Sequence, residues 1–260
     1  MFDLGVKNKK VLVTGGTHGI GRAIAIAFAK QGCEVAVCSR TEERVSETID
    51  ILDSVGVRNY GGCVDALNKN EIDNFCGKLK SEFGAVDILI NNVGGGGRWG
   101  KEAIEETSIQ VWKEVLEKNL FAALNFTLNL LPSMRENKWG RVITISSLVG
   151  RECLGRPWYN IAKGSEIQLM KSMACNPQIA KDGITFNTIA PGSIMIPNTG
   201  WEDEAKNNTK VYQEKVNSLP MGRLGTPEEV ASVALFLGSI QSSLVSGACI
   251  PVDGSEGKAY

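Results

Sequence analysis

Short runs rich in β-branched residues alternate with longer stretches of helical spacing, and this alternation limits the fold more than any other feature of the sequence. Apolar residues recur every three or four positions in the longer stretches, which is typical of helices with one buried face. Strands that alternate with helices form right-handed βαβ units, so their strands are parallel and helices cover both faces of the sheet. The sequence therefore predicts an α/β chain with a doubly wound parallel sheet.

The predicted elements run through the whole chain without a Pro- or Ser-rich linker, so we expect one domain over residues 1–260. The predicted strands are Lys10–Thr14, Glu34–Cys38, Asp87–Ile90, Arg141–Ile145, Ile184–Ile189 and Ala248–Val252. The predicted helices are Gly21–Gln31, Asn70–Phe83, Ser108–Met134, Trp158–Met173 and a last helix from Thr226-Pro227 to about Leu237. Pro cannot donate a helical hydrogen bond, so Pro177 should end or kink the helix from Trp158 near Cys175.

Composition excludes several classes of protein. The 28 Lys and Arg residues nearly balance the 29 Asp and Glu residues, and no basic tract is present, which argues against a nucleic-acid-binding protein. The sequence has no apolar leader and no run of 18 apolar residues, so we expect a cytoplasmic protein without a membrane span. Seven cysteines without a C-x-x-C pair and a single histidine indicate reduced thiols and no metal site.

A glycine-rich loop joins the first predicted strand to the first helix, with the sequence TGGTHGIG over Thr14–Gly21. Gly15 permits the sharp exit from the strand, Gly19 lets backbone amides approach a phosphate, and Gly21 permits close helix–strand packing. The helix N-terminus favours an anion, so the loop predicts a dinucleotide-binding site.

The end of the second predicted strand indicates which dinucleotide is bound. An NAD site usually places Asp or Glu there, whereas this chain has Ser39-Arg40. The Arg40 guanidinium suits a 2′-phosphate, and Ser39, Thr17 and His18 add donors, so we expect NADP(H), with NAD(H) as the alternative. In that alternative Arg40 forms a solvated ion pair with the acidic residues that follow it.

Tyr159 and Lys163 lie four residues apart at the start of an apolar helix, so they share one helical face. An ammonium beside a phenol favours the phenolate and lowers its pKa, which suits proton transfer to or from a carbonyl-derived oxygen. The serines Ser146 and Ser147 follow a predicted strand at the edge of the sheet where ligands bind.

Seven motifs occur in order over essentially the whole chain. They are TGGTHGIG (Thr14–Gly21), NNVG (Asn91–Gly94), Asn119, ISS (Ile145–Ser147), YNIAK (Tyr159–Lys163), NTIAPG (Asn187–Gly192) and RLGTPEEVA (Arg223–Ala231). In this combination the chain resembles the short-chain dehydrogenase/reductase family. The resemblance implies a Rossmann-type fold of about seven strands, a nicotinamide cofactor, and hydride transfer to or from a carbonyl or alcohol carbon.

The resemblance also implies residue roles. Tyr159 is the expected general acid in reduction, Lys163 binds the nicotinamide ribose, Ser147 holds the substrate oxygen, and Asn119 holds a water that links Lys163 to solvent. Further expected cofactor contacts are Ile20 in the phosphate loop, Asp65 and Ala66 near adenine, Asn92, Val93 and Gly94 near the nicotinamide ribose, and Pro191, Gly192 and Ile194 near the carboxamide.

The chain departs from the family pattern at several of these positions. Ser147 precedes Tyr159 by 12 residues instead of the usual 13, which is the spacing of Ser146. We assign the catalytic role to Ser147 because Leu148, Val149 and Gly150 match the residues that usually follow that serine, and Ser146 is the alternative. Val93 replaces a smaller alanine, and Ile196 replaces a threonine that bonds the carboxamide.

The substrate pocket is expected between the glycine-rich segment Gly94–Lys101, the segment Arg151–Trp158 and a lid over residues 193–220. Trp99, Arg156 and Trp158 are the candidate substrate residues, and Arg156 or Arg151 is a candidate anion clamp. Because the lid sequence is polar, we expect a polar substrate with a carbonyl or secondary alcohol, sugar-like or carboxylated. The alternatives are a 3-oxoacyl-thioester reductase, an NAD(H)-dependent polyol dehydrogenase and, more remotely, a non-catalytic dinucleotide-binding regulator. By family resemblance we expect a homotetramer, or a dimer.

Overall fold

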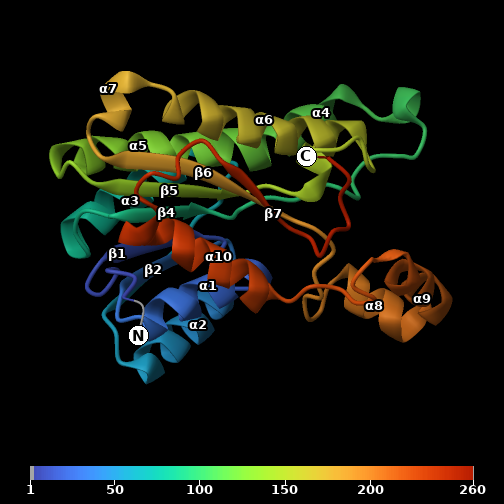
Figure 1. The fold of residues 1–260 in the computed structure, drawn as a ribbon, viewed down its shortest axis with the longest axis horizontal. Coiled ribbons are helices and arrows are strands. Elements are labelled where there is room, and N and C mark those ends of the chain that lie inside the picture. Colours follow the sequence, from blue (N-terminus) through green and yellow to red (C-terminus); the bar gives the residue numbers. More distant parts are fainter. Residues whose placement is uncertain (1–2, 260) are drawn as a thin grey trace.

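A central sheet of seven parallel strands forms the core of the computed structural model, which describes residues 3–259 (Figure 1). The strands are β1 (Lys10–Thr14), β2 (Glu34–Ser39), β3 (Asn59–Cys63), β4 (Ile88–Asn91), β5 (Gly140–Ile145), β6 (Ile184–Pro191) and β7 (Cys249–Val252). Their order in the sheet is β3-β2-β1-β4-β5-β6-β7, and every neighbouring pair is parallel. The predicted doubly wound parallel sheet is therefore confirmed. The order reverses between β1 and β4, which is where such sheets bind ligands.

Helices cover both faces of the sheet (Figure 1). They are α1 (Gly19–Lys30), α2 (Glu42–Val55), α3 (Lys69–Glu82), α4 (Ile109–Leu116), α5 (Ala122–Glu136), α6 (Pro157–Ala174), α7 (Pro177–Ala180), α8 (Gly200–Asn207), α9 (Thr209–Ser218) and α10 (Pro227–Gly238). Helices α1, α2 and α10 pack on one face, and α3, α5 and α6 pack on the other. None of the helices between residues 3 and 259 is long and apolar enough to cross a membrane.

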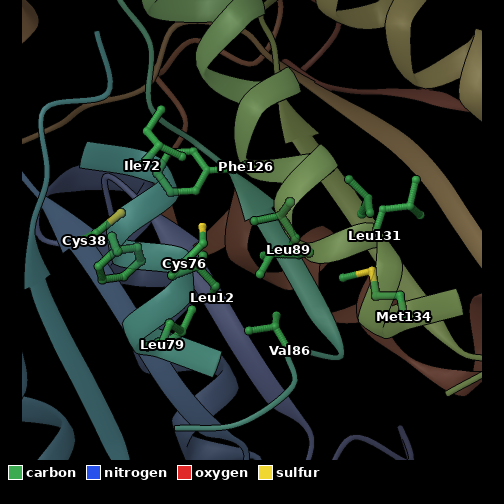
Figure 2. Packing of buried hydrophobic residues seen from close by; sticks show 14 of the residues in the cluster. Leu12, Cys38, Ile72, Cys76, Leu79, Val86, Leu89, Phe126, Leu131 and Met134 are labelled. Carbon is green, nitrogen blue, oxygen red and sulfur yellow. The ribbon is translucent and has the colours of Figure 1, made fainter. Parts of the chain in front are cut away.

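Each face of the sheet has its own apolar core. In the core of Figure 2, Ile72 and Leu79 of α3 pack with Phe126 of α5 against Leu12 and Leu89 of the sheet. The opposite core joins α1 to α10 so closely that a Cβ on Gly238 would lie 2.7 Å from the Phe28 ring. Burial of this apolar surface holds the strands in register and fixes the edge at which they all end.

The helix predicted over Ser108–Met134 is interrupted by one π-helical turn, η2 (Glu117–Phe121). Asn119 lies in this turn, and its side-chain amide donates to the carbonyl of Val115 at 2.7 Å, four residues back. A side chain that bonds a helical carbonyl locally replaces the regular ladder, and π turns of this kind are common at functional sites. The interruption therefore coincides with the residue that the sequence singled out in this helix.

Proline and capping residues set the helix ends as the sequence predicted. Helix α6 has its C-cap at Cys175, and Pro177 starts the separate short helix α7. At the start of α10, Thr226 and Glu229 form a reciprocal capping box, and Pro227 is the first helical residue.

The long polar connection over residues 193–220 folds as the helices α8 and α9, which project from one end of the molecule (Figure 1). Lys215 of α9 pairs with Glu256 near the C-terminus at 2.6 Å. Glu256 in turn accepts hydrogen bonds from the backbone amide and hydroxyl of Ser193, where the segment begins. These bonds tie both ends of the segment to the body of the protein.

Candidate active site

The carboxyl ends of β1 and β4 are joined by a small hydrogen-bond network. The Thr14 hydroxyl donates to the carbonyl of Ile90 at 3.3 Å and accepts from the amides of Asn92 and Val93 at 3.0 and 3.2 Å. The Asn92 side-chain amide donates back to the carbonyls of Thr14 and Gly15 at 3.0 and 3.1 Å. Asn92 thus links the ends of β1 and β4 by hydrogen bonds, and it also lines the site.

The glycine-rich loop requires glycine for two reasons, positive φ angles and close contacts of the backbone with its neighbours. Gly15 and Gly19 have φ values of +61° and +52°, a region that disfavours other L-residues. A Cβ on Gly21 would lie 2.3 Å from the Gly15 carbonyl and 2.4 Å from the Asn92 amide. The loop therefore starts α1 directly against the strand end, with the helix N-terminus facing the cavity beside it.

This first cavity has a volume of about 290 Å³ and collects most of the predicted cofactor residues. Those lining it are Gly15, Thr17, His18, Ser39, Arg40, Asp65, Ala66, Asn92, Val93 and Gly94. Arg40 is exposed, and within residues 3–259 it makes no ion pair, although acidic residues follow it in the sequence. Its guanidinium is therefore free to face an anion.

Sequence reasoning missed two further cations at this cavity, Arg44 of α2 and Lys118 of η2. Burial and then the Arg44 charge lower the pKa of His18, and burial and the Arg40 charge lower the pKa of Lys118. Arg44 lies in the first turn of the helix that follows Arg40. This position in the sequence is the signal from which its place at the cavity could have been predicted. Together these side chains make the cavity electropositive.

A second cavity, of about 340 Å³, lies beyond the glycine-rich loop. The predicted residues that line it are Ile20, Ser146, Ser147, Tyr159, Pro191, Gly192 and Ile194. Ile196 also lines it, and a Cβ on Gly19 would touch the Ile196 side chain at 2.8 Å. Thr199, Gly200 and Trp201 bring the start of α8 to its rim.

The candidate substrate residues are not placed on this cavity. Trp158 is fully buried and packs edge-on against Trp112 of α4 at a ring-centroid distance of 5.4 Å, because it lies on the inner face of α6. Arg156 donates to the carbonyl of Lys101 and pairs with Glu102 at 3.7 Å. Trp99 packs in the same small cluster as Trp158. The Arg151 guanidinium donates to the carbonyl of Ala259 at 3.0 Å and also lies away from the cavity.

The cation that does line the second cavity is Arg98, in the middle of the segment Gly94–Lys101. Its guanidinium reaches the N-terminus of α8, since a Cβ on Gly200 would lie 2.4 Å from it. Among the described residues that line this cavity, Arg98 is the one with a formal charge. A segment of four glycines gives no periodic pattern from which this orientation could be predicted.

The two serines differ in how their hydroxyls are used. The Ser146 hydroxyl is buried and donates to the carbonyl of Lys163 at 2.8 Å. The Ser147 hydroxyl accepts from the amide of Val149 at 3.4 Å, which leaves its proton available to the cavity. This geometry favours Ser147 over Ser146 as a donor to a bound oxygen.

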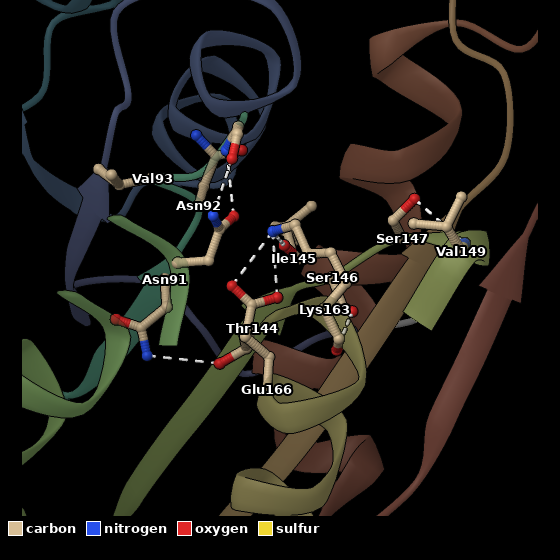
Figure 3. Close-up of polar contacts among 12 residues, drawn as sticks. Asn91, Asn92, Val93, Thr144, Ile145, Ser146, Ser147, Val149, Lys163 and Glu166 are labelled. Carbon is tan, nitrogen blue, oxygen red and sulfur yellow. Dashed lines mark hydrogen bonds and ion pairs between the residues drawn. The ribbon is translucent and has the colours of Figure 1, made fainter. Parts of the chain in front are cut away.

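Lys163 is buried behind the two cavities, one helical turn from Tyr159. Its ammonium donates to the carbonyl of Ile145 at 3.1 Å and to both carboxylate oxygens of Glu166 at 3.0 and 3.1 Å (Figure 3). Burial raises the pKa of Tyr159, with Lys163 opposing that rise and Glu166 adding to it. Burial by itself would lower the pKa of Lys163, but Glu166 and Tyr159 outweigh it, so the net direction is upward. Sequence reasoning missed Glu166.

Asn119 and Lys163 meet behind Gly94. A Cβ on Gly94 would lie 2.7 Å from the Asn119 side-chain oxygen and 2.8 Å from the Lys163 Nζ. Asn119 is completely buried, donates to the carbonyls of Gly95 and Val115, and accepts from the amide of Gly95 at 3.0 Å. These bonds hold Gly94 and Gly95 against the lysine.

Comparison with known proteins places this arrangement in context. The family model for enoyl-(acyl carrier protein) reductase matches residues 15–255. An uncharacterized oxidoreductase of Bacillus subtilis is 34% identical over 253 residues, which cover 96% of this chain and 91% of that protein. A 3-oxoacyl-(acyl-carrier-protein) reductase of Aquifex aeolicus is 33% identical over 255 residues, covering 97% and 99% of the two chains.

A solved structure of L-sorbose reductase from Gluconobacter frateurii, complexed with NADPH and L-sorbose, is similar over its whole length. It superposes with a TM-score of 0.91 at 31% sequence identity and covers 100% of both chains.

The packing at Gly94 generates the first prediction. We expect Gly94→Ala to lower NADPH-dependent turnover about 100-fold, because the added methyl group displaces the Lys163 ammonium or the Asn119 oxygen. The same crowding should lower the thermal unfolding midpoint by a few degrees, so activity is compared well below it. The matched control is Gly77→Ala in α3, where nothing lies within 4 Å of the new methyl group. Equal activity of the two variants, measured by the change in NADPH absorbance, would contradict the prediction.

Proposed function

The chain belongs to the short-chain dehydrogenase/reductase family and is an oxidoreductase of carbonyl or alcohol groups, and we propose that it is an NADP(H)-dependent reductase of a polar, carboxylated carbonyl compound. The observation that carries this proposal is the position of Tyr159 and Ser147. Both line the second cavity, directly beside the cavity that has the glycine-rich loop of a dinucleotide site.

The first cavity fits a dinucleotide. The loop glycines leave a cradle that any Cβ would fill, and the N-terminus of α1 with Arg40 and Arg44 supplies positive charge for phosphates. Ala66 and Leu67 suit an adenine ring, and Gly94 leaves room for the nicotinamide ribose beside Lys163. When bound, the nicotinamide supplies or accepts the hydride of the reaction.

The chain's own residues handle the proton. We assign Tyr159 Oη as the donor to the oxygen of the carbonyl that is reduced, and the Ser147 hydroxyl as the second hydrogen-bond donor to that oxygen. Lys163 stabilises the phenolate that remains after the transfer, because its ammonium lies one turn from the phenol on α6. Asn119 bonds the backbone of Gly95 and thus keeps the Gly94–Gly95 turn against Lys163.

Arg98 supports a carboxylated substrate. Its guanidinium lies on the cavity that Tyr159 and Ser147 share, and it reaches the polar helix α8. An unpaired guanidinium recognises a carboxylate by charge-assisted hydrogen bonds. We propose that residues 193–220 act as a lid, because the start of α8 forms the rim of this cavity. In this proposal residues 1–260 form one catalytic domain that includes its own lid.

Two alternatives have specific support. Reduction of a 3-oxoacyl thioester is favoured by the similarity to the Aquifex aeolicus enzyme, and a keto-sugar or polyol by the similarity to L-sorbose reductase. We also propose a homotetramer. Exposed apolar side chains on α4, α5 and α6, namely Ile109, Leu128 and Ile161, support an interface on that face.

Replacement of the proposed acid tests the function. We expect Tyr159→Phe to lower kcat about 10²–10⁴-fold while NADPH binding, followed by nicotinamide fluorescence, is kept, because only the proton donor is lost. Full activity of the variant on every compound that the wild type reduces would contradict the assignment and would favour a non-catalytic role for the site.

Arg40 should decide between the two dinucleotides. We expect Arg40→Asp to weaken NADPH binding about 10–100-fold and to improve NADH binding, because a carboxylate repels the 2′-phosphate and bonds a free ribose hydroxyl. Lys78→Asp, on the exposed face of α3, makes the same change of charge away from the cavity and is the control. An unchanged ratio of the two dissociation constants would show that Arg40 does not read the phosphate.

Arg98 should discriminate anionic from neutral substrates. For a 3-oxo acid and its methyl ester, we expect Arg98→Gln to lower kcat/KM about 10–100-fold for the acid and little for the ester. The matched control is Arg156→Gln, whose guanidinium bonds the Lys101 carbonyl instead of lining the cavity. Equal losses on acid and ester would overturn the anion preference, and activity only on thioesters or keto-sugars would favour those alternatives.

A further inference from the structure

A buried carboxylate touches the proposed active-site lysine and has no part in the reaction as described above. Glu166 is 1% exposed, and Lys163, three residues earlier on the same face of α6, is 3% exposed. Both carboxylate oxygens lie within 3.1 Å of the Lys163 Nζ. A buried carboxylate is costly unless it is paired, and an apolar side chain would fill the same space without that cost. Glu166 is paired with the buried Lys163 ammonium, and this pairing also sets the net charge on the face of α6 that Tyr159 shares.

The contacts of Lys163 show how the charge is placed. Besides Glu166, the ammonium bonds the carbonyl of Ile145 at the end of β5, and Gly94 closes over it from the other side. These contacts with Ile145 and Glu166 hold the ammonium at a fixed point (Figure 3). Its nitrogen lies 5.9 Å from the centre of the Tyr159 ring. Ser146 lies on the same side and bonds the Lys163 carbonyl, which anchors the backbone of this turn.

The charges of the pair act on Tyr159 with opposite sign. The Lys163 ammonium favours the phenolate, and the Glu166 carboxylate disfavours it. The other charged groups that face the cluster are Lys118 of η2, which lies close enough to Lys163 to interact with it, and Arg98 across the second cavity. Burial raises the pKa of Glu166 to about 7, against the opposing effect of Lys163, so the carboxylate is ionised in the alkaline range. There its charge offsets part of the effect of the Lys163 ammonium on the phenol.

We propose that Glu166 is a positioning residue that offsets the Lys163 charge and keeps Tyr159 in its protonated, proton-donating form. The inference rests on the proposed function, since it concerns the same tyrosine and lysine. It assigns the site to carbonyl reduction, because a reductase needs a phenol that still holds its proton, whereas alcohol oxidation needs the phenolate. Burial supports this by raising the pKa of Tyr159 above its ordinary value.

The test is the pH dependence of Glu166→Gln, a substitution that keeps the shape and one oxygen acceptor but removes the charge. Without the carboxylate, the Lys163 ammonium acts on Tyr159 alone, so the phenol loses its proton at lower pH. In the plot of kcat/KM against pH, reduction falls at alkaline pH and oxidation falls at acidic pH, both as Tyr159 changes its protonation state. We expect the apparent pKa of each of these two limbs to move to lower pH by about one unit or more. A structural role alone would lower kcat without moving either limb.

Two variants serve as controls. Glu166→Asp keeps the charge and should leave both limbs near their wild-type positions, and Glu47→Gln removes an exposed carboxylate from α2 and should change nothing. Limbs that stay in place, or move to higher pH, in an active Glu166→Gln enzyme would overturn the inference and leave the proposed function intact. Wild-type protein that turns over no carbonyl or alcohol with either nicotinamide cofactor would instead overturn the proposed function.

A second measurement does not depend on activity or on the folding of Glu166→Gln. The phenolate absorbance of the wild-type protein, minus that of Tyr159→Phe, gives the titration of Tyr159 directly. We expect it to ionise at or above the ordinary tyrosine value of about 10. Ionisation near neutral pH would show that Lys163 acts on the phenol without an offset, and the inference would be wrong.

Discussion

The site depends on the close approach of α1 to the ends of β1 and β4. A Cβ at Gly21 would lie 2.3 Å from the Gly15 carbonyl, and Asn92 bonds the carbonyls of Thr14 and Gly15 in the same place. With a larger residue at Gly21, the helix N-terminus would stand away from the strand ends, and the first cavity would lose its positive wall. The sheet order reverses between β1 and β4, and ligands bind at such a point in doubly wound sheets. The contact of Gly21 with Gly15 and Asn92 lies at this point, beside the two cavities.

Charge in the site is arranged by depth. Arg40, Arg44 and Arg98 lie at the cavity surfaces, where they suit the anionic groups of a cofactor and a substrate. Lys163 lies deeper and is neutralised by Glu166, because an unpaired ammonium would be costly there. The cations that we propose for binding are thus left free, and the cation that we propose for proton transfer is held by a partner.

Much of the fold was predictable because its signals are local. The runs of β-branched residues indicated β1, β2, β4, β5, β6 and β7. Strand β3 has the sequence NYGGC and no such run, so its position was not predicted. The π turn at Asn119 was not predicted, since a side chain that replaces a helical bond leaves no periodic signal. Trp158 was misplaced for a similar reason. Its neighbours in sequence are near the site, but the rotation of α6 directs its ring into the core against Trp112.

The sequence by itself determined the βαβ order, the glycine-rich loop and the spacing that puts Tyr159 and Lys163 on one helical face, because each depends on residues close together in the chain. Tertiary structure alone decided which cations meet each cavity. Arg98 reaches α8, whereas Arg156 bonds the Lys101 carbonyl, and this choice follows from the path of an irregular glycine-rich segment. It also decided the environment of Lys163, since the carbonyl of Ile145, Gly94 and Asn119 come from other elements. Contacts between distant segments depend on how the layers pack, and local spacing carries no record of that packing.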